Sequence, residues 1–209
     1  MNQDKQFIAG YCTIEGNCIA VNGEIAFEAK GKAFTEFAKQ AYQFSEISYP
    51  KFFKMDNLSK LAFLASDMLV KNEIVEGGDN NIALLFANCS SSLDTDMKYM
   101  DMIADKENYH PSPSVFVYTL PNICMGEISI RYNLHTENSF FIFENFNAKF
   151  FAGYSGVMLK IYKAEKVLCG WVEFYNDTYK AFMYLVAKEG SIQHTEENIQ
   201  TLYNKSWKH

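Results

Sequence analysis

Cysteine is the most reactive side chain in this 209-residue sequence, and its five copies are scattered: Cys12, Cys18, Cys89, Cys124 and Cys169. A cysteine acts as a nucleophile or a metal ligand through its thiolate. The five show no Cys-x-x-Cys pair and no zinc-ligand spacing. An odd number of cysteines without such spacing predicts free thiols in a reducing compartment. We therefore expect a cytoplasmic protein that binds no metal.

The four histidines, His110, His135, His194 and His209, form no metal-binding pattern, and no Gly-x-Ser-x-Gly motif marks a serine nucleophile. Surface or hydrogen-bonding roles are expected for all four. Residue types and spacing alone therefore identify no catalytic group and no cofactor.

The chain is acidic, with a net charge of −6 and a sequence pI of about 5.3. This balance excludes nucleic acid and anionic membranes as partners of the chain as a whole. No apolar run approaches the ~20 residues that a membrane-spanning helix needs. Residues 1–20 lack the apolar core of a signal peptide, so none is expected.

The hydrophobic pattern alternates between strands and helices. Strands are expected at 7–14, 82–87, 139–143, 167–174 and 181–187, and helices at 32–44, 58–70, 148–162 and from 195 to about 203. Apolar residues in 58–70 follow helical spacing, and Asp56 or Asn57 is the expected N-cap. The continuous apolar run 82–87 is typical of a strand buried on both faces. The pattern predicts an α/β domain with a mostly parallel central sheet and helices on its faces.

Several stretches, taken in order, resemble the β-ketoacyl-acyl-carrier-protein synthases of the thiolase-like superfamily. They are Met55-Asp56 followed by residues 59–64, residues 112–116 followed by Thr119-Leu120-Pro121-Asn122, Gly126 before residues 128–130, and Val167-Leu168-Cys169-Gly170 up to Glu173. The resemblance covers residues 7–175 and implies the first half of a thiolase-like fold. The family's second half, which carries two catalytic histidines and a glycine-rich oxyanion loop, has no counterpart here.

The resemblance also places the family's nucleophilic cysteine. Counting forward from Asn133-Leu134 and back from Gly170 leads both times to Asn145. An asparagine cannot hold an acyl chain as a thioester, so this position implies that the chain does not condense acyl units by itself. Chain-length-factor subunits, which resemble active synthases, carry a glutamine there. Asn145 is either a structural relic or an amide donor that polarises a thioester carbonyl.

Two further residues keep an enzymatic alternative open. In the family frame Cys124 lies near the nucleophile region, and Cys169 follows in the 167–174 strand. A buried structural thiol is the commoner role for such a cysteine, and a displaced nucleophile is the alternative. The aromatic run 140–143 is expected to be a core strand, and the resemblance places that strand at a dimer interface.

The predicted organisation is a single domain over 1–209, with 176–209 as a divergent extra strand and helix. Half of a pseudo-dimeric fold leaves one face uncovered, which predicts a homodimer or a heterodimer with an active ketosynthase, and acyl-carrier protein is a further candidate partner. The resemblance implies a non-condensing accessory subunit in fatty-acid or polyene/polyketide-type biosynthesis. The alternatives are a stand-alone module that binds an acyl chain or acyl-carrier protein, and an acyltransferase that uses a displaced cysteine.

Overall fold

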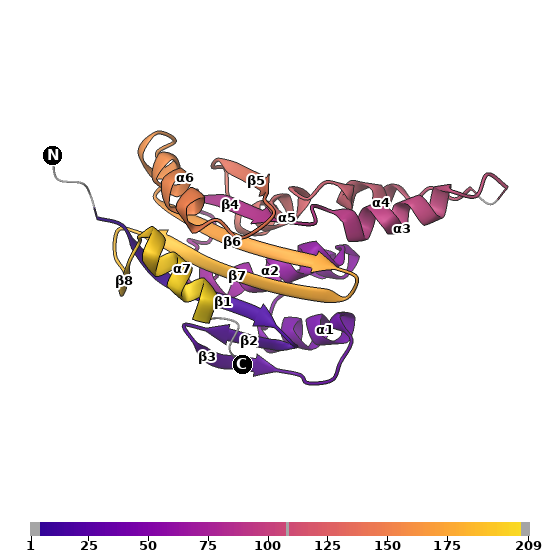
Figure 1. Ribbon diagram of the computed structural model, residues 1–209, viewed down its shortest axis with the longest axis horizontal. Helices are drawn as coiled ribbons and strands as arrows, with labels where there is room; N and C mark the ends of the chain where they lie inside the picture. The colour runs from indigo at the N-terminus through magenta and orange to yellow at the C-terminus, as the bar shows by residue number, and fades with distance from the viewer. Residues whose placement is uncertain (1–4, 108, 206–209) are drawn as a thin grey trace.

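The computed structural model describes residues 5–107 and 109–205. Within them a single eight-stranded sheet runs in the order β3-β2-β1-β7-β6-β4-β5, and β8 pairs with β1 (Figure 1). The strands are β1 (Phe7–Glu15), β2 (Cys18–Val21), β3 (Glu24–Glu28), β4 (Ile82–Asn88), β5 (Asn138–Ile142), β6 (Lys166–Tyr175), β7 (Thr178–Ala187) and β8 (Ile192–Gln193).

Helices cover both faces of this sheet, as predicted. They are α1 (Phe34–Phe44), α2 (Asn57–Val70), α3 (Leu93–Ile103), α4 (Pro113–Phe116), α5 (Ile123–Tyr132), α6 (Ala148–Lys160) and α7 (Glu196–Lys205), with 3₁₀ turns η1 (Pro50–Lys54) and η2 (Val117–Thr119). One face carries α1, α2 and α5, and the other carries α6 and α7. In Figure 1, α3 and α4 extend away from the body of the molecule.

The prediction of a mostly parallel sheet was wrong, because the sheet is mixed. Only β4–β5 and β4–β6 are parallel pairs among the described strands. The pairs that β1 makes with β2, β7 and β8, and the β2–β3 and β6–β7 pairs, are antiparallel. The fold is therefore α/β with a parallel part limited to β4, β5 and β6.

Three two-residue turns explain the antiparallel part. Gly16-Asn17, Asn22-Gly23 and Asn176-Asp177 join β1 to β2, β2 to β3 and β6 to β7, and both residues of each pair have positive φ. Two positive φ values define the type I′ turn, whose twist matches that of an antiparallel hairpin, and Asn, Asp and Gly adopt this conformation most readily. Each of these turns makes the two strands that it joins run antiparallel to each other.

Strand β7, which comes late in the sequence, lies inside the sheet and not at its edge. Strand β7 lies between β1 and β6, and residues 181–187 are all buried. Cys12 of β1 lies opposite Met183, and Leu168 of β6 lies opposite Leu185. Among the described strands, β1 is thus joined to the parallel strands only through β7.

Alternate side chains of the strands point into two separate hydrophobic cores, one on each face of the sheet. In β4, Leu84 and Phe86 face the core under α1, α2 and α5, whereas Ala83 and Leu85 face the core under α6 and α7. Successive side chains of a strand point to opposite faces, so a strand buried on both faces is apolar throughout. The continuous apolar run 82–87 therefore indicated this strand correctly.

The predicted helix at 58–70 is confirmed as α2, and its N-cap is Asp56. The carboxylate of Asp56 accepts a hydrogen bond of 2.9 Å from the backbone N–H of Ser59. This contact satisfies one of the amide groups that a helix start leaves without a partner. The predicted helices at 32–44 and 148–162 and the one near the end of the chain are also present, as α1, α6 and α7.

Candidate functional site

The predicted nucleophile position lies at the carboxyl edge of the three parallel strands. The turn after β4 and the loop after β5 meet there, because the backbone N–H of Phe143 donates to the carbonyl of Asn88 over 2.9 Å. In α/β sheets, ligand sites form beyond the carboxyl ends of parallel strands, where loops are free to vary. The position of Asn145 in the second loop therefore puts it where this architecture builds sites.

The turn after β4 is held by hydrogen bonds. The side chain of buried Asn88 both donates to the carbonyl of Ser91, over 2.8 Å, and accepts from its N–H, over 2.9 Å. From β6, the carboxylate of Glu173 accepts from the backbone N–H of Cys89 over 2.7 Å. The Ser92 hydroxyl donates to the carbonyl of Thr119 over 2.7 Å. These contacts give residues 89–92, with the sequence Cys-Ser-Ser-Ser, the structural role of a turn.

Asn145 lies in the loop between β5 and α6, and its side chain is exposed. No hydrogen bond joins it to any residue in the described part of the chain. Two residues later, Asn147 caps α6 by accepting from the backbone N–H of Phe150 over 2.9 Å. Asn145 therefore lies just before the amino terminus of α6. A helix amino terminus lowers the pKa of a cysteine thiol placed there. The asparagine amide has no such acidic proton and forms no thioester.

Aromatic rings hold this loop on both sides of Asn145. Phe143 packs edge-on against Phe150, with ring centroids 4.8 Å apart. Phe146 stacks on Tyr203 of α7 at 4.0 Å and on Phe151 at 5.3 Å. Such contacts stabilise aromatic pairs beyond simple burial. The terminal helix α7 therefore packs directly against the loop that carries Asn145.

The two cysteines proposed as displaced nucleophiles are both buried. Cys124 lies in α5, and its thiol donates to the carbonyl of Pro121 over 3.1 Å. Burial raises the pKa of Cys124 far above the ordinary thiol value, and it raises the pKa of Cys169, in the middle of β6, to about 12. A thiol with such a pKa is protonated at neutral pH. Because only the thiolate attacks, neither position favours nucleophilic chemistry.

The described histidines are separated from one another. His110 is exposed after α3, and His135 contacts the side-chain oxygen of Asn133 over 2.8 Å. His194 is half-buried, 3.5 Å from the hydroxyl of Ser155. His209 lies outside the described residues. No cluster of three or more metal-ligating side chains occurs within 5–107 and 109–205, and none of the helices there is long and apolar enough to cross a membrane.

A buried acidic network was missed by the sequence analysis. Glu127 of α5 is 3% exposed, accepts from the hydroxyl of Tyr118 over 2.9 Å, and pairs with the ammonium group of Lys51 over 2.9 Å. Nearby, Asp56 accepts from the hydroxyl of Thr95 over 2.8 Å. These contacts join η1, η2 and α5 and tie α3 to the start of α2. Glu127 sits between Gly126 and Ile128, inside a stretch that carries the family resemblance.

Comparison with known proteins gives structural matches only. No protein-family model matches the chain, and no curated protein matches it significantly. The ishigamide ketosynthase/chain length factor superposes with a TM-score of 0.63 and 16% identity, over 88% of this chain and 62% of the other. A ketosynthase in complex with its chain length factor, from Xenorhabdus doucetiae, gives 0.61 and 12%, over 98% and 92%.

A third match also contains a ketosynthase. It is a ketosynthase bound to the hexaketide and complexed with a type II polyketide acyl-carrier protein, with a TM-score of 0.57 and 13% identity, over 94% of this chain and 64% of the other. This chain thus spans less than two thirds of two of the three matched chains and almost all of the Xenorhabdus one. At these identities the likeness establishes the fold. The chain has the fold of ketosynthases and chain length factors, as its sequence motifs predicted.

Proposed function

We propose that this chain is a ketosynthase-like accessory subunit that does not condense acyl units itself and works bound to an active ketosynthase. The observation that carries the proposal is that the loop between β5 and α6 presents Asn145, and no thiol, just before the start of α6. The pathway class is polyketide-type or fatty-acid synthesis. The Xenorhabdus match, a ketosynthase with its chain length factor, supports this reading because it is aligned over nearly the whole of both chains.

Two exposed surfaces favour a protein partner. Strand β5 pairs only with β4 among the described strands, and Ile142 at its end is half exposed. A strand edge with unpaired backbone groups is a template for association. The second surface is the apolar arm, which we define as residues 93–107 and 109–120. Its exposed large side chains are Leu93, Met97, Met100, Tyr109, Phe116, Val117 and Leu120. We propose that the active ketosynthase covers both surfaces.

The binding experiment measures the mass and the affinity of the complex. The purified chain is mixed with each ketosynthase of its own organism and analysed by light scattering after size exclusion. We expect a stable mixed complex with one of them, and a change in the length of its products by mass spectrometry. A chain that ignores every ketosynthase would overturn the accessory role and favour a stand-alone binding module.

Matched variants test the arm within that complex. Met100→Asp and Phe116→Asp put a charge on the arm, whereas Ile25→Asp puts one on β3 at the opposite edge of the sheet. The exposed fractions are 56%, 57% and 57%, so all three should fold alike. We expect the arm variants to weaken the complex at least about 10-fold and Ile25→Asp to leave it unchanged. Equal affinities would remove the arm from the interface and leave the accessory role standing.

The alternative function, an acyltransferase that uses a displaced cysteine, predicts that a thiol of the chain reacts with acyl thioesters. It requires that an acyl-thioester probe label Cys124 or Cys169 at neutral pH. The burial and the raised pKa of both thiols lead us to expect no labelling of either in the folded chain. Stoichiometric acylation of one of them, located by peptide mass spectrometry, would contradict the proposal that the chain does no acyl transfer.

A further inference from the structure

A cleft of about 410 Å³ lies on the α6 side of the sheet, between α6 and β8. Three segments far apart in the sequence build it: residues 5–6 before β1, the outer face of α6, and residues 193–194 at the end of β8. Its volume falls in the range of small-molecule sites. The cleft follows the second half of α6 to Lys160, ~20 Å along the helix axis from the end that follows Asn145.

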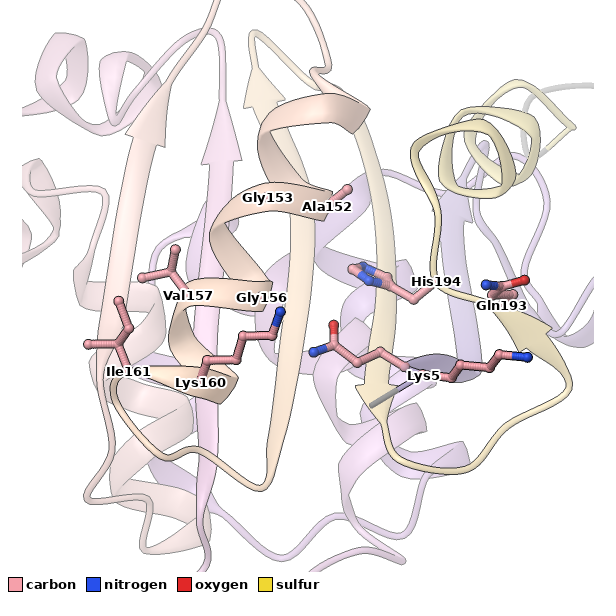
Figure 2. A pocket seen from close by; sticks show the side chains of 10 residues that line it. Lys5, Ala152, Gly153, Gly156, Val157, Lys160, Ile161, Gln193 and His194 are labelled. Atoms are coloured by element: carbon pink, nitrogen blue, oxygen red, sulfur yellow. The ribbon is translucent and has the colours of Figure 1, made fainter. Parts of the chain in front are cut away.

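The charge of the lining is opposite to that of the protein. Lys5 and Lys160 line the cleft, and no aspartate or glutamate is among the described residues that do so, although the net charge of the chain is −6. Figure 2 shows the side chains of Lys160 and His194 both extending into the space between α6 and β8, while Lys5 extends away from α6. Lys160 is therefore the cation placed to meet a bound group.

The wall opposite Lys160 offers neutral hydrogen-bonding groups. Gln6, Gln193 and His194 line this side, and the backbone N–H of His194 donates to the carbonyl of Gln6 over 2.9 Å, which fixes the two segments together. Burial lowers the pKa of His194 to about 4, so its ring is uncharged at neutral pH. Its Nε2 lies 3.5 Å from the Ser155 hydroxyl, whose own proton goes to the carbonyl of Phe151.

The α6 wall is apolar and leaves room. Ala152, Val157 and Ile161 line it, and Ile161 is 67% exposed. A Cβ atom added to Gly153 or Gly156 would meet no atom within 4 Å, so the space in front of these two glycines is open. One wall of the cleft is thus suited to an apolar group, and the ends are suited to a charge and to hydrogen bonds.

We propose that this cleft binds a small organic anion with a short apolar tail. The carboxylate or phosphate meets the Lys160 ammonium and the amides of the opposite wall, and the tail lies on Val157 and Ile161. A charged hydrogen bond to the anion supplies affinity and the apolar wall selects the tail. This site is separate from the ketosynthase-facing surfaces, so its failure would not affect the proposed accessory role.

The test titrates the purified full chain, by calorimetry and by amide chemical shifts, with hexyl phosphate, hexanoate, inorganic phosphate and hexyltrimethylammonium. We expect saturable one-to-one binding of hexyl phosphate or hexanoate, weaker binding of inorganic phosphate, and none of the cation. The two hexyl compounds distinguish a phosphate from a carboxylate ligand. Shifts should concentrate at residues 5–6, 152–161 and 193–194.

Two variants and their controls locate the binding. Lys160→Gln removes the cation and should weaken binding about 10-fold, the value of one charge-assisted hydrogen bond. Lys149→Gln, in the first turn of the same helix and outside the cleft, should change nothing. Gly156→Leu fills the cleft and should abolish binding, whereas Gly126→Leu in α5 should not. The absence of saturable binding, equal losses in both lysine variants, or equal binding of the cation would overturn the proposal.

Discussion

Helices α2 and α3 are both amphipathic segments of one chain, yet they end in opposite surroundings. Ten residues of α2 are buried, and the helix packs on β1, β6 and β7 as well as on α1 and α5. In α3 only Thr95 is buried, while Met97 and Met100 are more than half exposed. The apolar face of α2 is covered within the chain, and that of α3 is not. This difference supports the proposal that a partner protein covers the apolar arm.

The largest expected difference between the two helices is in local stability. Backbone amides in α2 open only with the core, whereas those in α3 are covered by few contacts. We expect amide hydrogen exchange in α2 to be at least about 100-fold slower than in α3 for the isolated chain. Exchange measured by mass spectrometry, with and without the partner ketosynthase, checks this. Equal protection in the free chain would contradict the comparison.

Truncating one side chain in each helix gives the next largest effect. Leu64 of α2 is fully buried, so Leu64→Ala should lower the free energy of unfolding by about 3 kcal/mol through lost burial and a cavity. Met100→Ala in α3 should change it by less than about 0.5 kcal/mol. Urea denaturation of both variants measures the values. A loss at Met100 as large as at Leu64 would show that the arm packs within the chain.

Thr95, the buried residue of α3, links this helix to α2. The hydroxyl of Thr95 donates to the carboxylate of Asp56 at the start of α2. Thr95→Val keeps the shape and removes this bond, which should cost about 1.5 kcal/mol because the acceptor is a charged group. The same variant should raise amide exchange in α3 more than in α2. Unchanged exchange in α3 would show that Asp56 does not anchor the arm.

The smallest expected effect is a pH dependence at the same contact. Burial raises the pKa of Asp56 above its ordinary value of 3.8, which outweighs the hydrogen bonds from Ser59 and Thr95. At Asp56 the folded chain therefore holds more of a proton than the unfolded chain between pH 3.8 and the raised value, so the contribution of this one group to stability falls as pH rises through that window. Asp56→Asn keeps an N-cap and should remove this slope. Denaturation series from pH 4 to 7 compare the two proteins, and identical slopes would contradict the raised pKa.

Sequence reasoning found the elements whose signal is local. The helical spacing of 58–70 and the continuous apolar run 82–87 both give elements at the predicted places. The turns Gly16-Asn17, Asn22-Gly23 and Asn176-Asp177 were equally readable, because positive φ favours these residue types, and they would have corrected the parallel sheet and revealed β2 and β3. The mostly parallel sheet was predicted from the alternation of strands and helices, without use of the residue types in the turns.

The candidate site was only partly readable. The motif frame led to Asn145 at the start of a helix, and that helix is α6, but the role of Asn145 stays a prediction. The packing of Phe146 on Tyr203 depends on α7, which lies more than fifty residues further along the chain. The burial of Glu127 likewise depends on Lys51 and Tyr118, which approach it only in the folded chain.

The sequence by itself determined the helices and strands with strong periodicity, the direction of the hairpins, and the absence of a thiol at position 145. These properties depend on neighbouring residues and on the chemistry of one side chain. Only the tertiary structure decided that β7 separates β1 from β6, that α3 stays uncovered while α2 is enclosed, and that residues 5–6, α6 and residues 193–194 share a cleft. Such pairings join segments up to about 190 residues apart, where local propensity carries no information and only the burial of complementary surfaces selects the arrangement.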